Sequence, residues 1–388
     1  MSEYDARTYA TALGRVKEAP MRPQFKLGLV RDYLIPRLVH NLTFSVVSSG
    51  KLRSMSHDTR RAVRSWLNLP TSCPNSYIHA SLKDGGLGVP DFTIFLPKNR
   101  CNRLSKLEGS AVPAVREAFR LHGAAALAAA RRAVTRNNMR PSHTQSLHAS
   151  VDGSELKLCS EGSESVAWMR YPNGLSGSDF RNFARIRINA LPSRTRVNRG
   201  RNGPTFCRAC GAPSETLAHI IQVCPRTHGD RLGRHDAIVK RLAGGLSDRK
   251  LEVNTEQTYK LQDGNLKPDI VALKSDGARG HVSVVCDVQI CSSNNAQAWH
   301  EHKVRKYASR ADLKTAIRAE HLSTDVLTVV ATLTWRGVWV PSSIRSLRAL
   351  GLSSRFLASL PTMVLRGAMI SWRRFNTDTG THRRVGVG

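Results

Sequence analysis

Apolar residues recur at helical spacing near the start of the chain. Within the segment 22–69, the residues Leu27, Val30, Tyr33 and Leu34 fall on one face of a helix, so the pattern predicts a helical run. Pro36 should kink or break that run, because proline lacks a backbone N–H and its ring clashes with the preceding turn.

The helical pattern continues, with interruptions, to about residue 135. Asp58 is the expected N-cap of a helix with an apolar stripe formed by Val63, Trp66 and Leu67. The segment 104–135 is also predicted to be helical and ends in an alanine-rich stretch. The segment 137–165 is polar and shows little periodicity, which indicates a linker or a domain edge.

The pattern changes in the last third of the chain. Short β-branched segments separated by turn residues predict strands at 256–262, 266–275, 281–290 and 325–334. A long helix is expected between the last two strands, and two more helices should close the chain. This order of elements predicts a compact α/β domain.

The charge of the chain indicates its class of partner. Lys and Arg number 59 and Asp and Glu 29, which gives a net charge of +30. A polyanion fits this excess, because each neutralised phosphate releases counterions. A membrane surface fits poorly, because no long basic amphipathic helix with an aromatic face occurs and no apolar run reaches the length of a span.

Four residues form the most specific motif in the chain. Cys207, Cys210, His219 and Cys224 have the spacing C-x2-C-x8-H-x4-C. Two cysteines on a tight turn, followed by a His and a Cys on the next short helix, form a closed tetrahedral ligand set for structural Zn²⁺. The single knuckle lacks the wider Cys-to-His spacing and the paired histidines of DNA-reading fingers, which argues against a zinc-finger transcription factor.

An arginine-rich segment precedes this motif. Arginine forks suit phosphate oxygens, so we expect the segment to contact the backbone of a nucleic acid. The alternative is a solvated face of an amphipathic helix. The residues assigned to nucleic-acid binding are Arg185, Arg187, Arg194, Arg196, Arg199 and Arg201.

A second candidate site lies in the α/β domain. Asp269 follows a proline, and Asp287 ends an apolar strand, so neighbouring strands would bring both carboxylates to one edge as ligands of a divalent cation. Lys303 and Tyr307 are four residues apart and share a face of the following helix. We expect Lys303, rather than Lys306, to orient water or to stabilise charge on phosphate.

Taken together, these motifs resemble the C-terminal half of the polyprotein of site-specific non-LTR retrotransposons that insert into ribosomal DNA. The resemblance rests on the Cys-Cys-His-Cys knuckle before the nuclease, on a displaced lysine in the pattern K-x-x-K-Y at 303–307, and on "INALPSR" at 188–194. It also rests on "GGLGVPDF", which is similar to the thumb after the family's polymerase palm. A Gln stands at 289, where the restriction-like nuclease pattern has Lys.

The resemblance implies a Mg²⁺-dependent endonuclease that nicks target DNA so that the exposed 3′ end primes reverse transcription. Asp269 and Asp287 would hold Mg²⁺, Lys303 would assist, and Tyr307 would support the site. DNA and the element's RNA are the expected partners, together with a second copy of the chain or a separate polymerase subunit. No Tyr-x-Asp-Asp signature occurs, so polymerase activity is not expected of this chain, and a fragment, a truncated copy or a derived gene is expected.

The expected architecture is multidomain, with a mainly α N-terminal region, a small zinc knuckle and a C-terminal α/β restriction-endonuclease-like domain. Its boundaries are 1–100 for a helical thumb-like region, 101–200 for a helical and Arg-rich linker, 201–228 for the knuckle and 229–388 for the nuclease. Paired arginines are compatible with nuclear import, so a nuclear location is expected. The alternative function is a catalytically inactive retroelement product that binds nucleic acid without cutting it.

Overall fold

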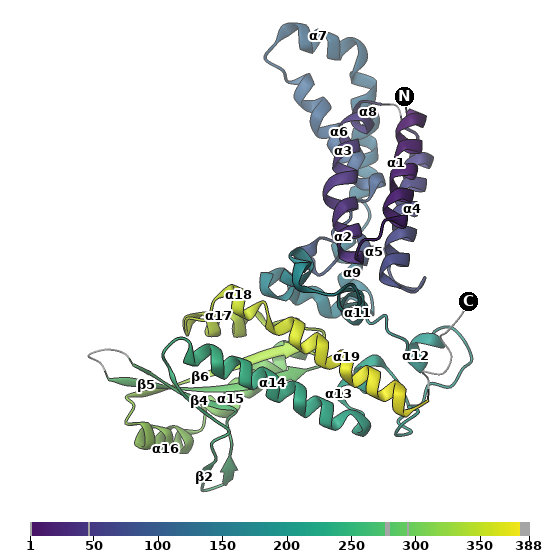
Figure 1. Ribbon diagram of the computed structural model, residues 1–388. Helices are drawn as coiled ribbons and strands as arrows, with labels where there is room; N and C mark the ends of the chain where they lie inside the picture. Colours follow the sequence, from purple (N-terminus) through teal and green to yellow (C-terminus); the bar gives the residue numbers. More distant parts are fainter. Residues whose placement is uncertain (1, 46, 276–279, 293–294, 381–388) are drawn as a thin grey trace. The chain divides into compact units, whose positions relative to one another are not determined.

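The computed structural model describes residues 2–45, 47–275, 280–292 and 295–380 (Figure 1). The chain forms two compact units. Unit 1 comprises residues 1–154 and 174–188, and unit 2 comprises residues 155–173 and 189–388. The predicted linker at 137–165 contains the first point at which the chain passes from one unit to the other. The predicted four-part division, with boundaries at 100, 200 and 228, stays a prediction.

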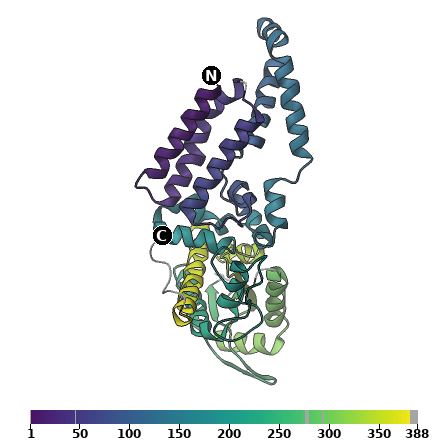
Figure 2. The same ribbon diagram turned by 90° about the vertical axis from the view of Figure 1, so that its right-hand side faces the viewer.

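Unit 1 is helical. The purple helices α1, α3 and α4 lie alongside one another in Figure 2. The elements of this unit are α1 (Ser2–Glu18), α2 (Pro23–Gly28), η1 (Leu29–Leu34), α3 (Ile35–Phe44), α4 (Ser49–Leu67), α5 (Asn75–His79), η2 (Leu82–Asp84), α6 (Phe92–Glu108), α7 (Pro113–His122), α8 (Ala124–Asn138), α9 (His143–Ala149) and α11 (Gly177–Arg187).

Two sequence expectations for unit 1 are modified by the structure. The interruption expected at Pro36 takes the form of a π-helical turn, η1, directly before the proline in the first turn of α3. Asp58 is not an N-cap, because α4 runs through it. The cap is Ser48, whose side chain accepts a hydrogen bond from the backbone N–H of Lys51 at 3.2 Å. The predicted stripe on α4 is buried as expected.

Unit 2 is built on a small mixed sheet. Its strands are ordered β1-β4-β5-β6, and only β5 and β6 pair in parallel among the described strands. A hairpin of β2 and β3 stands beside it. The strands are β1 (Glu252–Thr255), β2 (Tyr259–Leu261), β3 (Gly264–Leu266), β4 (Ile270–Ser275), β5 (His281–Cys291) and β6 (Asp325–Thr334).

Helices cover both faces of the sheet. One face packs against α14, α17, α18 and α19 through a large apolar cluster, and α14 and α19 lie side by side (Figure 1). The other face packs against α15 and α16, where Tyr307, Leu313 and Ile317 meet Val271 and Val285. These helices are α14 (His228–Ser247), α15 (Ala296–Ala308), α16 (Ala311–His321), α17 (Pro341–Ala349), α18 (Ser354–Leu357) and α19 (Leu360–Asp378).

The remaining elements of unit 2 are short. The predicted long helix between the last two strands is divided at residues 309–310 into α15 and α16. The segment 155–173 joins unit 2 through Ser165, whose hydroxyl accepts a hydrogen bond from the Trp339 backbone N–H at 2.9 Å. The short elements are η3 (Ser154–Glu161), which begins at the last residue of unit 1, η4 (Ser163–Ser165), α10 (Ala167–Arg170), η5 (Pro172–Gly174), α12 (Arg194–Val197), α13 (Leu217–Gln222) and η6 (Pro225–Thr227).

Candidate functional site

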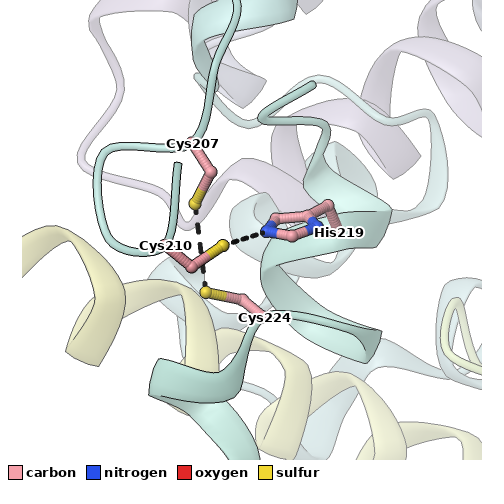
Figure 3. A group of neighbouring side chains, drawn as sticks. All are labelled: Cys207, Cys210, His219 and Cys224. Atoms are coloured by element: carbon pink, nitrogen blue, oxygen red, sulfur yellow. Dashed lines mark hydrogen bonds between the residues drawn. The ribbon is translucent and has the colours of Figure 1, made fainter. Parts of the chain in front are cut away.

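The four predicted zinc ligands converge in unit 2 (Figure 3). Their ligand atoms all lie within 4.8 Å of one another. Cys207 Sγ is 3.9 Å from Cys224 Sγ, and Cys210 Sγ is 3.3 Å from His219 Nε2. Ligands at usual zinc distances on a tetrahedron would be ~3.8 Å apart for two sulfurs and ~3.5 Å apart for sulfur and nitrogen. The donor set and its spacing therefore fit Zn²⁺.

Local backbone chemistry shapes this cluster. The Cys207 N–H donates to the Ala212 carbonyl at 2.7 Å, and the Gly211 N–H donates to the Cys207 carbonyl at 2.9 Å. Gly211 has φ of +72°, a left-handed conformation that glycine adopts without steric cost. Thr216 caps α13 by accepting from the His219 N–H at 2.9 Å. A tight turn and a capped helix thus bring the two ligand pairs together.

The thiols of the cluster differ in their surroundings. Burial raises the pKa of Cys224 to about 12. A backbone hydrogen bond from Ala212 lowers the pKa of the exposed Cys210. A metal must therefore displace a firmly held proton from Cys224, so binding by this cluster competes with protons.

A buried carboxylate braces the turn from behind. Glu215 is fully buried and forms an ion pair with Arg208 at 2.9 Å. It also accepts hydrogen bonds from the backbone N–H groups of Arg194 at 2.9 Å and Arg208 at 3.0 Å. The hydrogen bonds from Arg208 hold the pKa of Glu215 below its usual value, against the effect of burial. Glu215 therefore ties the turn that carries Cys207 and Cys210 to the arginine-rich segment.

The two predicted acids lie on neighbouring strands. β4 and β5 pair in antiparallel register with Ile270 opposite Cys286, which places Asp269, one residue before β4, opposite Asp287. The backbone N–H of Val288 donates to Asp269 Oδ2 at 2.6 Å. Alternation along β5 turns Val288 into the large apolar cluster and leaves Asp287 on the face covered by α15.

Two side chains of α15 reach Asp287. Lys303 Nζ forms an ion pair with Asp287 Oδ2 at 3.0 Å, and the Tyr307 hydroxyl donates to Asp287 Oδ1 at 2.6 Å. Burial raises the pKa of Tyr307, so the hydroxyl keeps its proton. Lys306 is exposed and lies over the Tyr307 ring, 5.3 Å from its centroid. Lys303 is therefore the lysine that forms the ion pair with Asp287.

Asp287 is only 3% exposed, and its Oδ2 has the Lys303 ammonium as its ion-pair partner. The buried amide oxygen of Gln289, two positions along the same face, accepts no hydrogen bond among the described residues. A buried oxygen without a hydrogen bond is costly, and carboxylate and amide oxygens are the ligand type that Mg²⁺ prefers. The donor set at this edge of the sheet therefore fits a hard divalent cation.

Sequence reasoning missed one member of this cluster, His235 on α14. Its Nε2 lies 3.4 Å from Asp269 Oδ2 and 3.3 Å from the Val288 carbonyl oxygen. The hydrogen bond to Asp269 raises the pKa of His235 to about 9. A lone histidine on a helix far from the acids in sequence gives no local signal, so only the packing of α14 on the sheet identifies it.

The six predicted phosphate-binding arginines are not equivalent. Arg187 is fully buried and Arg196 is 9% exposed, so neither presents its guanidinium to a backbone phosphate in this conformation. Arg185 is half-buried, and burial lowers its pKa. Arg194 is half-buried and stacks on Phe206 at 4.6 Å. Arg199 and Arg201 are exposed.

Among the described residues, no helix is long and apolar enough to cross a membrane. No protein-family model matches the chain. Curated proteins of known elements are, however, similar to the chain in sequence.

The chain is 34% identical over 380 residues to a retrovirus-related Pol polyprotein from type-1 retrotransposable element R2 of Nasonia vitripennis, covering 96% of this chain and 36% of that protein. It is 34% identical over 383 residues to the Pol polyprotein of type-2 element R2DM of Drosophila melanogaster, with the same coverage. The chain thus spans about a third of the length of these two relatives.

A shorter relative gives the fullest mutual coverage of the three. The Pol polyprotein of a type-1 R2 element from Popillia japonica is 30% identical over 389 residues, which cover 97% of this chain and 79% of that protein. Together with the two longer relatives, it shows that this chain belongs to the Pol polyproteins of R2 retrotransposable elements.

Proposed function

We propose that this chain is the endonuclease part of an R2-type Pol polyprotein and that it nicks DNA in a Mg²⁺-dependent reaction. The carrying observation is the convergence of Lys303 and Tyr307 on Asp287, which lies opposite Asp269 in the sheet. The nick would expose a 3′ hydroxyl that primes reverse transcription by the polymerase of the polyprotein.

In this proposal, Asp269 and Asp287 hold the cation. When bound, Mg²⁺ lowers the pKa of a coordinated water and neutralises charge on the scissile phosphate. The hydrogen bond from Val288 N–H fixes one oxygen of Asp269, and the hydrogen bond from Tyr307 fixes one oxygen of Asp287. Each carboxylate therefore keeps a second oxygen whose direction is set by its neighbours.

Lys303 supplies positive charge at the same place. Its ammonium group stabilises the charge that builds up on phosphate as water adds to phosphorus and the bond to O3′ breaks. The leaving O3′ then takes up a proton. Lys303 comes from α15 rather than from β5. It would take the place of the strand lysine of the nuclease pattern, because position 289 is a Gln in this chain.

The rest of the chain is proposed to hold the nucleic acid. A net charge of +30 and the exposed Arg199 and Arg201, which precede the cysteine–histidine cluster in the sequence, support binding to a phosphate backbone. We propose Zn²⁺ as the structural ion of that cluster, DNA and the element's RNA as partners, and the nucleus as the location.

Nicking of a supercoiled plasmid tests the activity. The purified chain with Mg²⁺ should convert supercoiled DNA to the open-circular form, and Asp269→Asn should slow the conversion strongly. Asp263→Asn is the matched control, because Asp263 is an exposed carboxylate of the same unit on the β2–β3 turn, with a side chain that is 81% exposed. Equal loss in both variants, or equal activity in Asp269→Asn and the wild type, would refute the assignment.

A second candidate function applies if Asp269 and Asp287 do not support DNA cleavage. A chain that binds DNA with a steep salt dependence and never nicks it would be a binding protein derived from the element. The pairing of Lys303 with Asp287 favours the nuclease. A half-buried ammonium on a buried carboxylate adds little stability, so a binding protein that no longer cuts DNA would have no use for it.

A further inference from the structure

A second cluster of metal-ligating side chains lies in unit 1, outside the sites described above. His79, Asp91 and His143 each offer one ligand atom, and the three atoms lie within 4.8 Å of one another. They come from the end of α5, the residue before α6 and the start of α9. Segments 64 residues apart in sequence therefore meet at one point.

The hydrogen bonds around the cluster aim its ligand atoms inward. His79 Nδ1 lies 2.8 Å from the Val89 carbonyl oxygen, which fixes the proton on Nδ1 and turns Nε2 toward Asp91. Asp91 Oδ1 accepts hydrogen bonds from Ser56 at 2.8 Å and from the Thr93 backbone at 2.9 Å. Asp91 Oδ2 is thereby left to face both imidazoles. Outer partners of this kind orient metal ligands.

One buried lone pair of the cluster has no close partner within it. His143 Nε2 lies within hydrogen-bond distance of Asp91 Oδ2 at 3.1 Å, whereas His79 Nε2 lies 3.8 Å from that oxygen. The side chain of His79 is 0% exposed and that of Asp91 is 9% exposed, so water does not reach the His79 lone pair, which a metal ion would satisfy. The Arg60 guanidinium approaches His79 Nε2 only to 3.5 Å, at the outer limit of a hydrogen bond.

We propose that His79, Asp91 and His143 bind a divalent transition-metal ion of the zinc type. Nitrogen and oxygen ligands on a zinc tetrahedron lie ~3.3 Å apart, which the two measured separations bracket. The side chain of His143 is 27% exposed and lines a surface pocket with Asp91, Asn137 and Gln145. Solvent in this pocket supplies the fourth ligand, and the ion fastens α9 to the segment between α5 and α6.

Zinc stoichiometry of the full chain tests the proposal. Wild-type protein loaded with Zn²⁺ should hold two equivalents by elemental analysis. A cysteine-specific mercurial should release one and leave the other, because this cluster contains no thiol. His143→Gln keeps an N–H donor for Asp91 but removes the ligand, so it should hold one equivalent, and the mercurial should release it.

His148→Gln is the matched control. His148 lies on the same helix and contacts the Asp84 carbonyl oxygen at 3.0 Å, outside the cluster. This variant should hold two equivalents. A wild-type chain with one equivalent that the mercurial removes completely would overturn the proposal, as would a His143→Gln variant that keeps two. Should His143→Gln fail to fold, the mercurial result on the wild type decides the question alone.

Discussion

The two ligand clusters of unit 2 differ in how the chain assembles them. The cysteine–histidine cluster takes its members from residues 207–224, where one turn and one short helix suffice. The acid–lysine cluster takes Asp269 and Asp287 from two strands and Lys303 from a helix, so it exists only when the sheet and α15 are packed. Local assembly suits an ion that stabilises the fold, and assembly across elements suits groups that must act together on a substrate.

The clusters also differ in what their residues contribute to stability. Metal at the cysteine–histidine cluster would add folding free energy, because four ligands are held together by one ion. The acid–lysine cluster buries a carboxylate, which costs stability and is tolerated where chemistry requires it. Substitutions should therefore separate the two clusters, with activity lost at one and stability lost at the other.

The largest effect is expected at Asp287. Asp287→Asn should lower the nicking rate by about a thousandfold, because a cation ligand and the partner of Lys303 are lost together. The protein should still fold cooperatively, because Asn has nearly the same shape as Asp and the partly exposed Lys303 ammonium can turn toward water. Nicking rates and thermal unfolding on the same preparation measure both. Joint loss of folding and nicking would break the proposed contrast between the clusters.

A somewhat smaller effect is expected at Cys210. Cys210→Ser should weaken zinc binding by about a hundred- to a thousandfold, since ~10–16 kcal/mol of binding free energy is shared among four ligands. Competition with a chromogenic chelator measures the affinity, and thermal unfolding should show a lower midpoint. Cys101→Ser, a thiol outside the cluster, should change neither. Unchanged zinc affinity in Cys210→Ser would show that Cys210 is not a zinc ligand.

The third effect separates two lysines one helical turn apart. Lys303→Ala should lower nicking about a hundredfold, the size expected for one group that stabilises charge in the transition state. Lys306→Ala should lower it only slightly, because Lys306 is exposed and lies over the Tyr307 ring. Single-turnover nicking rates at saturating DNA measure the difference. A larger loss in Lys306→Ala would reverse the assignment.

The smallest effect is expected at Tyr307. Tyr307→Phe leaves Asp287 Oδ1 without its 2.6 Å hydrogen bond, which should cost ~1–3 kcal/mol of unfolding free energy and about tenfold in nicking rate. Denaturant unfolding and the plasmid assay measure the two quantities. Tyr171→Phe removes a hydroxyl from a residue that is 73% exposed and should alter neither. A stable but fully inactive Tyr307→Phe would make Tyr307 a direct participant.

Sequence alone was sufficient where the signal was local. The convergence of Cys207, Cys210, His219 and Cys224 was predicted from spacing, and each of the four predicted strand segments contains a strand because its pattern is short-range. Pro36 marked a real change in helix type. The Asp58 cap failed, because a polar residue inside a long amphipathic helix has the same local pattern as one at its start.

Sequence alone was not sufficient where tertiary packing decides. His235 meets Asp269, and His79 meets Asp91 and His143, through contacts between elements far apart in the chain. The arginine-rich segment gives a second example. Charge alone predicted a phosphate-binding face, which stays a prediction, but it did not reveal that Arg187 and Arg196 are buried. Long side chains pack their stems into a core, so a count of charges does not give their exposure.

The fully buried Glu215 links the turn that carries Cys207 and Cys210 directly to the basic segment. One carboxylate holds the Arg194 backbone and both the backbone and the side chain of Arg208. Any loosening of the turn is therefore transmitted to the start of α12 without an intervening hinge. If the cluster holds zinc and the basic segment binds polynucleotides as proposed, loss of the ion would loosen this turn and weaken binding before the sheet unfolded.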